Sequence, residues 1–456
     1  MNRRQYAGES HAVYLLILLL LGAFVMGVKW VGIGMDTPAD GWINLALGGM
    51  LLAAFVIARL VRTLGLPMLS GYIFAGILAG PFVSGFLCAE TVDQLKLIDE
   101  LALSVIALAA GAELQLAVMK KRGWAILLHI LLITAFVLAL VVGFVFSFAS
   151  FFDVTAEFST VQIAAFAVLI GVISVARSPS STIAIISECR ASGRFTETVL
   201  GVTLLTDILV IIMFTSALAV SRQLLFAGGG MQWNTAVALG WEIIISLAIG
   251  ALLGKGISLY IRRVKFDFLI FLIFIAFAVS RASIGFNEYM AENAQMSLHL
   301  EPLLICMSAG FFIRNFTGQG GYFMESLDRI ALPVYVLFFS LAGAALDFGS
   351  LMLCWPLALG LVMARAAGLF AGSWAAGRVL GDPKDYQYCA WMTYLTQAGV
   401  AIGLAQLAMG EFPEIGNHLH TVVLAVIAIN QIAGPVLFKV ALHRVNESGR
   451  SRHGPV

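Results

Sequence analysis

Two apolar segments near the middle of the chain are interrupted by polar residues, and they read Val175-Ala176-Arg177-Ser178-Pro179-Ser180-Ser181-Thr182 and Leu204-Leu205-Thr206-Asp207-Ile208-Leu209. Each segment is long enough to cross a bilayer. An arginine, a proline or an aspartate at such a depth is costly in hydrocarbon unless it faces a cavity or a partner. We therefore expect these two stretches to form the working site, with the rest of the chain as its scaffold.

The composition excludes an ordinary soluble globule. Of the 456 residues, 60% are hydrophobic and only 12% are charged, whereas soluble domains have about half and about a quarter. The net charge of +1 gives no reason to expect a nucleic-acid partner. The five cysteines are scattered singly without a CxxC spacing, which favours packing roles over a metal site or disulfides. The sequence predicts a polytopic membrane protein in contact with lipid, without an enzymatic activity or a cofactor.

Long apolar runs predict an all-α protein of about 13–14 transmembrane helices. Four glycine pairs at i, i+4 spacing predict close helix packing, at 76 and 80, 250 and 254, 368 and 372, and 399 and 403. The predicted helices span residues 12–34, 43–60, 68–88, 96–117, 123–148, 162–188, 197–221, 235–262, 266–285, 298–318, 329–348, 351–377, 386–411 and 418–443.

The charges of the connecting loops predict the orientation. Lysine and arginine gather in every second loop, as at Arg59 and Arg62, whereas the alternate loops are acidic, as at Asp36 and Asp40. Cytoplasmic loops are enriched in basic residues, so both termini are expected in the cytoplasm. The expected location of the protein is the inner membrane. We expect an additional N-terminal transmembrane helix within 1–42, a membrane domain over 43–443 and a short cytoplasmic tail over 444–456.

Pro179 predicts a break in the segment 162–188, because proline removes a backbone donor and clashes with the preceding turn. Ser178 and Ser181 then lie beside freed backbone carbonyls, and together these oxygens are plausible ligands for a dehydrated monovalent cation. The alternative is a proline-kinked helix whose hydroxyls bond to their own backbone. The sequence alone leaves both interpretations open.

Asp207 and Arg365 are two charged residues expected near the bilayer midplane. A buried carboxylate there can hold either a proton or a metal ion, and this competition is itself an exchange mechanism. A structural aspartate neutralised by an arginine is the alternative. The guanidinium of Arg365 needs a carboxylate or helix C-terminal carbonyls as partners, so Asp207 and the carbonyls of broken helices are the candidates.

A second polar interruption follows at Tyr394-Leu395-Thr396-Gln397-Ala398-Gly399 in the segment 386–411. Counted from residue 68 and from residue 298, the two interruptions each fall in the fourth helix of a five-helix group. This spacing predicts inverted repeats over about 68–221 and 298–443, linked by helices within 235–285, with two broken helices that cross.

Several motifs together resemble the bacterial cation:proton antiporters of the sodium/hydrogen exchanger superfamily, in the potassium-efflux-like branch without its nucleotide-binding regulatory domain. The order and spacing of the motifs carry the resemblance, which covers nearly the whole chain after Ala39. They are Gly71-Tyr72-Ile73-Phe74-Ala75-Gly76-Ile77-Leu78-Ala79-Gly80-Pro81, Ala109-Ala110-Gly111-Ala112-Glu113-Leu114, the Arg177-Ser178-Pro179 break, Thr206-Asp207, Pro333-Val334-Tyr335-Val336-Leu337-Phe338-Phe339 and Thr396-Gln397-Ala398-Gly399.

The resemblance implies a homodimer in which Asp207 matches the ion-binding aspartate of the family. Thr206 occupies a position that holds a second aspartate in electrogenic members, so it implies one carboxylate per site and electroneutral exchange. Arg365 resembles a basic residue that faces the core from the family's second repeat.

From these observations we expect an antiporter that exchanges protons for Na+ or K+ by alternating access. Asp207 is the expected shared site, and Thr206 is expected to help it bind the transported cation. Ser178, Ser181 and Gln397 are expected ligands or organisers of the site, and Arg365 is expected to balance charge. One alternative is an organic-anion symporter, in which Arg177 or Arg365 binds the substrate carboxylate. The other is a membrane sensor that does not transport. Spacing does not rank Na+, K+ and Li+.

Overall fold

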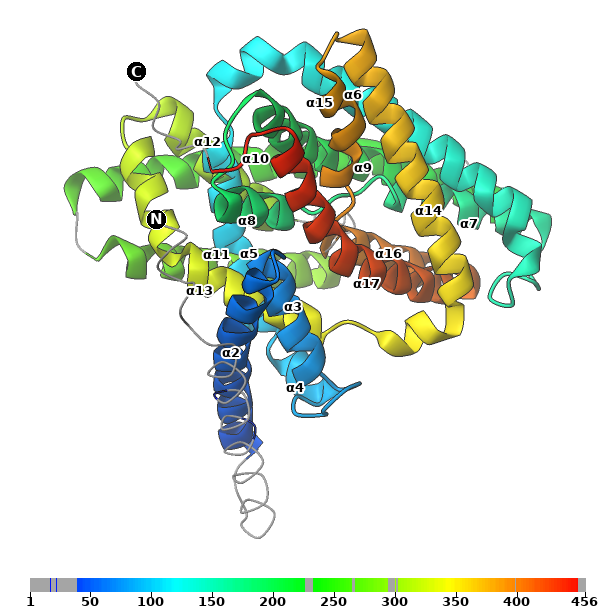
Figure 1. Cartoon of the computed structure of the whole chain (residues 1–456), viewed down its shortest axis with the longest axis horizontal. Coiled ribbons are helices and arrows are strands. Elements are labelled where there is room, and N and C mark those ends of the chain that lie inside the picture. Colours follow the sequence, from blue (N-terminus) through cyan, green and yellow to red (C-terminus); the bar gives the residue numbers. More distant parts are fainter. Residues whose placement is uncertain are drawn as a thin grey trace. The chain divides into compact units, whose positions relative to one another are not determined.

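The structure is a computed structural model that describes residues 17, 22, 39–225, 233–264, 267–293, 300, 302–397 and 399–449. The predicted helix over 12–34 lies outside these residues apart from two positions, and so does the end of the predicted tail. The described elements are α-helices and two short 3-10 helices, η2 and η3 (Figure 1).

Eight helices of the described residues are long and apolar enough to cross a membrane. Five further apolar helices of 10–17 residues accompany them. Together they show a multi-pass membrane protein. The eight spans are Asn44–Thr63, Arg122–Phe151, Arg194–Leu225, Ile244–Arg263, Phe268–Met290, Gly320–Ala344, Phe348–Val379 and Glu414–Arg444.

Two predicted boundaries differ from the structure for identifiable reasons. The helix expected over 68–88 ends at Ala79, because the chain turns extended at Gly80 and Pro81 follows. The helix expected over 123–148 begins at Leu116, so the basic residues of its supposed loop lie inside its first turns. Lysine and arginine are good helix formers whose long side chains reach the membrane surface, and the apolar run therefore understates the length of this helix.

The chain divides into two compact units, of which the first comprises residues up to Ala102 together with Leu332–Leu346. Its core joins Ala46, Met50, Leu87, Leu95, Leu341 and Ala344. Two glycines of α3 let neighbouring backbones approach, since no side chain would fit at Gly71 against Ala58 or at Gly76 against Ser340. Its elements are α2 (Ala39–Thr63), α3 (Met68–Ala79), α4 (Ala89–Gln94), the start of α5 (Lys96–Glu113) and the end of α13 (Gly320–Ala344).

The second unit comprises Leu103–Ala331 and Asp347–Val456 and contains every residue proposed for the site. Besides the remaining parts of α5 and α13, it contains α6 (Leu116–Phe148), η2 (Ala149–Phe151), α7 (Thr160–Ile173), α8 (Pro179–Cys189), α9 (Arg194–Leu225), α10 (Trp233–Arg263), α11 (Phe268–Asn293), α12 (Pro302–Phe316), α14 (Phe348–Val379), α15 (Lys384–Cys389), η3 (Ala390–Thr393), α16 (Gly399–Glu411) and α17 (Pro413–Arg444).

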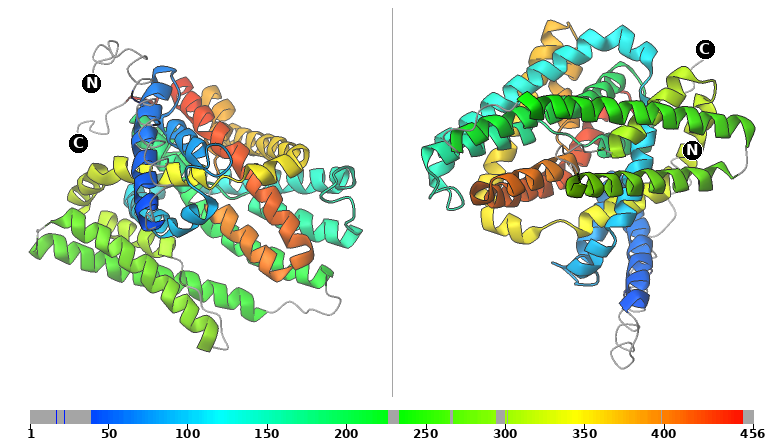
Figure 2. Two further views of the ribbon diagram at one scale, coloured as in Figure 1. Left: turned by 90° about the horizontal axis from the view of Figure 1, so that it is seen from below. Right: turned by 180° about the vertical axis from the view of Figure 1, so that it is seen from behind.

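Small residues determine which helices of the second unit pack closely. The long helices α6 and α14 lie side by side (Figure 1), with Gly368 and Gly372 of α14 against the backbone of Val137 and Ile133 in α6. Views from below and behind show α16 beside α17 (Figure 2).

The predicted glycine pairs can be compared directly with this packing. Gly250 and Gly254 of α10 face α12, and Gly76 of α3 and Gly80 directly after it face α13, as close packing requires. Gly403, in contrast, has open space where a side chain would extend. The first three pairs are therefore packing contacts, and at Gly403 the prediction was wrong.

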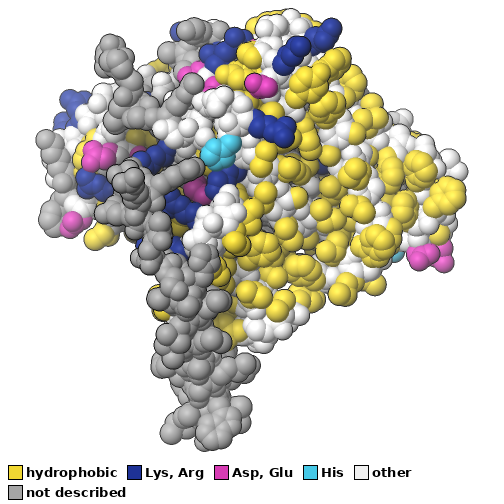
Figure 3. Space-filling model, viewed as in Figure 1, with side chains coloured by type: hydrophobic (Ala, Val, Ile, Leu, Met, Phe, Trp, Pro, Cys, Tyr) yellow, Lys and Arg dark blue, Asp and Glu magenta, His cyan; other side chains and the backbone are white. Residues whose placement is uncertain are grey.

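Apolar side chains cover the outer surface of α14 and its neighbours (Figure 3). Met352, Leu353 and Val379 of α14 are each at least 70% exposed, and Trp124 of α6 is 68% exposed. Large hydrophobic side chains in such numbers are stable at a surface that faces lipid rather than water.

Candidate functional site

The first predicted break divides its helix into two. Helix α7 stops at Ile173, and α8 starts at Pro179 with Ser178 as its N-cap. The Ser178 hydroxyl accepts the amide N–H of Ser181 at 3.2 Å and donates to the Ser181 hydroxyl at 2.9 Å. Ser178 and Ser181 therefore organise the start of α8. The sequence left open whether the helix breaks or whether its hydroxyls bond to their own backbone. The structure shows both, because the helix is broken and the Ser178 hydroxyl accepts a backbone N–H.

The second interruption is also a break, and it meets the first. After η3 the chain is non-helical from Tyr394 to Gln397. The backbone N–H of Ser178 donates to the Thr396 carbonyl at 3.0 Å. The Gln397 side chain donates to the Ile173 carbonyl at 3.2 Å, the last residue of α7. Two stretches more than 200 residues apart thus exchange hydrogen bonds directly.

Arg365 joins the two breaks from α14. It is fully buried, and its guanidinium donates four hydrogen bonds to carbonyl oxygens. The carbonyls of the first break are those of Ser174 at 2.7 Å and Ala176 at 3.1 Å, and those of the second are Leu395 at 2.7 Å and Tyr394 at 3.0 Å. A broken helix leaves such carbonyls without intrahelical partners. The planar guanidinium supplies the donors, and its charge compensates their dipoles.

Arg177 occupies the first break itself and points toward α9. Its Nη1 donates to the Thr206 hydroxyl at 2.8 Å, and its guanidinium lies 4.5 Å from the centre of the Tyr394 ring. The Thr206 hydroxyl in turn donates to the Val202 carbonyl at 2.6 Å. Thr206 is therefore held between a cation and its own helix in this conformation.

Asp207 follows Thr206 on α9 and is only partly buried, whereas Thr206 is fully buried. Its carboxylate interacts electrostatically with the Arg177 guanidinium. Asp207 lies about 20 Å along α9 from Arg194, at about 1.5 Å per residue, which corresponds to the interior of a membrane-spanning helix. A partly accessible carboxylate beside a fixed cation can take up and release a small ion.

Asn430 of α17 is a site residue that the sequence reasoning missed. It is fully buried and donates to the Gln397 side-chain oxygen at 2.8 Å, which fixes the Gln397 amide between α17 and α7. A carboxamide in the interior of an apolar segment was the available signal, since such groups are rarely placed in a membrane without a partner.

A small cavity lies on the Arg194 side of the site. It has a volume of about 20 Å³ and is lined by Arg122, His129, Arg194, Asp382, Tyr386 and Tyr394, among others. Such a polar space is sufficient for one water molecule. Two arginines of its lining form ion pairs, Arg194 with Asp382 at 2.7 Å and Arg122 with Glu197 at 2.8 Å. Tyr394 connects the cavity to Arg177.

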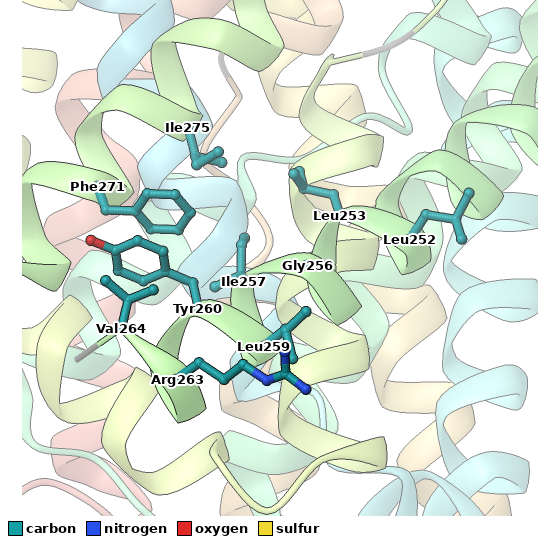
Figure 4. A pocket seen from close by; sticks show the side chains of 10 residues that line it. All are labelled: Leu252, Leu253, Gly256, Ile257, Leu259, Tyr260, Arg263, Val264, Phe271 and Ile275. Carbon is teal, nitrogen blue, oxygen red and sulfur yellow. The ribbon is translucent and has the colours of Figure 1, made fainter. Parts of the chain in front are cut away.

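A second hollow, of about 530 Å³, lies between α10 and α11 (Figure 4). Tyr260 stacks on Phe271 with ring centres 3.7 Å apart, and Arg263 lies at its edge. The lining contains no carboxylate. This groove therefore offers no negative charge to a cation, and the candidate site remains at the two breaks.

Comparisons with known proteins were made for the whole chain. A family model described as "Sodium/hydrogen exchanger, transmembrane" matches residues 50–443. No curated protein gives a significant match.

Two solved structures of one protein resemble this chain in fold. A structure of the sodium proton antiporter MjNhaP1 from Methanocaldococcus jannaschii at pH 8 has a TM-score of 0.61 and 16% identity, covering 89% of this chain and 96% of that one. An electron-microscopy structure of the same antiporter has a TM-score of 0.61 and 15% identity, covering 89% and 95%. The predicted fold class is confirmed by this likeness.

Proposed function

Because the chain belongs to the sodium/hydrogen exchanger family, we propose that it exchanges protons for a monovalent cation, Na+ or K+, by alternating access with Asp207 as the shared site. One observation supports this proposal above the others. Two broken helices meet beside a partly accessible carboxylate, and a buried arginine holds their free carbonyls. Such a site offers a charge and backbone dipoles to a cation in the interior of a membrane.

In the proposed cycle, Asp207 releases its proton before it binds the cation. The two ligands compete for one negative charge, so each drives the other off as the site faces one side and then the other. The Arg177 guanidinium keeps its charge throughout and limits how strongly the carboxylate holds a cation. A solved structure that is similar in fold is named as a sodium proton antiporter, and this likeness supports transport of this kind.

We also propose that exchange is electroneutral. Thr206 contributes a hydroxyl that bridges Arg177 and Val202 and has no titratable charge at physiological pH. One carboxylate then carries one proton in one direction and one monovalent cation in the other. The inverted repeats, a homodimer, cytoplasmic termini, an inner-membrane location and the potassium-efflux-like branch are parts of the same proposal.

Arg365 argues against one of the two arginines named for the organic-anion symporter. A symporter would need a guanidinium able to bind a substrate carboxylate, whereas Arg365 already donates to four carbonyls. Withdrawing it would leave those buried carbonyls without partners, which is costly. Arg177 stays the candidate of that alternative, because two of its guanidinium nitrogens have no hydrogen-bond partner among the residues that the structure describes.

Proteoliposomes loaded with a pH-sensitive dye test the proposal. Addition of Na+ or K+ to the wild-type protein is expected to move protons, and Asp207→Asn is expected to abolish this movement. Asp153→Asn, in the η2–α7 connection, is the matched control and is expected to transport normally. An imposed membrane potential is expected to leave the rate unchanged.

Each alternative predicts a distinct result. Cation-driven proton movement that survives in Asp207→Asn would contradict the shared-carboxylate mechanism. Flux that requires an organic acid and no metal cation would favour the symporter. Absence of flux at every pH would favour the sensor.

A further inference from the structure

The segment that follows α17, Val445–Gly449, folds back against the helices of the site, and we call it the return segment. The Glu447 carbonyl accepts the backbone N–H of Ser192 at 3.1 Å, and Gly449 N–H donates to the Cys189 carbonyl at 2.8 Å. One bond reaches the connection between α8 and α9, and the other reaches the last residue of α8. The sequence indicates only a polar tail here, so the structure adds a packed element.

The Glu447 side chain is the centre of the return segment. It is 1% exposed, although glutamate is rarely buried without partners. Its carboxylate accepts the N–H groups of Phe195 at 2.9 Å and Thr196 at 2.8 Å. It also accepts the Thr196 hydroxyl and the Tyr386 hydroxyl, each at 2.8 Å. Four donors thus surround one carboxylate.

Two of these donors are orphan amides of the first turn of α9. Helix N-termini leave such groups without intrahelical partners and favour a negative charge beside them. Because Glu447 comes from a segment about 250 residues away, it caps α9 through tertiary structure. Tyr386 belongs to α15, which leads through η3 into the second break. Glu447 therefore connects the start of the helix that carries Asp207 to the start of the second broken helix.

Gly193 shows that this position is tightly fitted around the carboxylate. A side-chain carbon built on Gly193 would overlap the Glu447 carboxylate, and the φ of Gly193 is +149°. Only glycine allows both this backbone conformation and the close approach. Replacement of Gly193 would therefore displace Glu447 without changing its charge.

The two ion pairs near the same end of α9 cannot replace Glu447. Arg194 is 49% exposed in its pair with Asp382, and Glu197 is 43% exposed in its pair with Arg122. Exposed pairs are weak and are screened by salt. The buried carboxylate with four donors is the stronger connection.

We infer that Glu447 is a positioning residue of the ion site: it fixes the start of α9 relative to the second break and thereby sets the cation affinity at Asp207. This inference rests on the proposed antiport. The cation then binds to a site whose geometry depends on a carboxylate that never contacts the cation.

The test combines hydrogen–deuterium exchange with cation titration of the full-length protein in liposomes. The variant Glu447→Gln keeps the shape of the side chain and removes its charge. We expect amide exchange to accelerate at least tenfold in peptides covering 193–200 and 384–397. The cation concentration for half-maximal proton movement should rise about three- to tenfold, while the maximal rate changes less than twofold. Glu447→Asp, which keeps the charge, should lie between Gln and the wild type.

Further variants keep the test decisive. Gly193→Ala and Tyr386→Phe each disturb the same connection by another route and should shift the half-maximal concentration in the same direction. If Glu447→Gln does not fold, the same two measurements on these variants test the inference. Glu325→Gln, in an exposed pair with Arg329 on α13, is the matched control and should change neither readout.

The outcomes separate the inference from the proposed function. Faster amide hydrogen exchange confined to residues 193–200, with an unchanged half-maximal cation concentration, would show that Glu447 only caps α9. This result would overturn the inference. Unchanged exchange in both peptides would overturn it as well. If the wild type moves no protons, the proposed antiport fails, and hydrogen exchange in 384–397 still reports whether Glu447 connects the two elements.

Discussion

Replacement of Arg365 by lysine provides the sharpest test of how the two breaks are held. The guanidinium donates from three nitrogens to four carbonyls, two in each break. Lysine keeps the positive charge but presents three donors from one nitrogen, so it cannot reproduce four hydrogen bonds that spread from three nitrogens. We expect two of the four bonds to be lost, and two buried carbonyls to be left without donors.

The expected destabilisation follows from these two carbonyls. A buried polar group without a partner costs about 1–3 kcal/mol, and the lower half of this range applies in membranes, where the unfolded reference also finds partners. Arg365→Lys should therefore lower the free energy of unfolding by about 2–4 kcal/mol. At about 2 °C per kcal/mol for a large domain, the melting temperature should fall by about 4–8 °C.

Thermal melting of the purified protein, followed by size-exclusion chromatography after heating, measures this change. Arg378→Lys on the same helix is the matched control, because Arg378 is exposed and lies 5.5 Å from the centre of the Trp374 ring. An exposed contact of this kind contributes about 0.5–1 kcal/mol, and lysine retains part of it. A melting temperature of Arg365→Lys equal to that of the control would refute the account of the breaks.

Two further predictions concern the proposed exchange site at Asp207. Thr206→Asp should make exchange respond to an imposed membrane potential, because a second carboxylate allows a second proton per cation; a rate that stays independent of the potential would contradict the role given to Thr206. Lowering the pH should raise the half-maximal cation concentration by up to tenfold per pH unit in the range where Asp207 binds its proton, with little change in the rate at saturating cation. A maximal rate that falls while the half-maximal concentration stays constant would argue against competition at Asp207.

The two breaks were predictable because their residues oppose the helix locally. Pro179 cannot continue a helix from the preceding turn, and the polar run from Thr396 to Gly399 interrupts an apolar segment. The same local logic gave the carbonyls of broken helices as candidate partners for Arg365. The candidate partners of Arg365 were Asp207 and these carbonyls. The carbonyls accept the hydrogen bonds that the structure describes for the Arg365 guanidinium.

What the sequence did not indicate depends on contacts between distant residues. In the sequence, Glu447 is one polar residue of a short tail. The folded chain brings its carboxylate to the backbone N–H of Phe195, which is 252 positions away. Asn430 likewise gains its meaning from Gln397 on another element. The start of α6 was missed for a different reason, because hydropathy marks only the apolar part of a helix whose basic first turns lie near the membrane surface.

The way Arg365 holds the breaks has a consequence for natural sequence variation. The guanidinium binds main-chain oxygens of Ser174, Ala176, Tyr394 and Leu395, and every amino acid has such an oxygen. Other amino acids at positions 174, 176 and 395 would therefore keep these hydrogen bonds between Arg365 and the two breaks. Tyr394 is further restrained, because its ring lies beside Arg177. The arginine itself has no equivalent substitute. An alignment of relatives should then show one nearly invariant position on α14 together with variable residues at positions 174, 176 and 395.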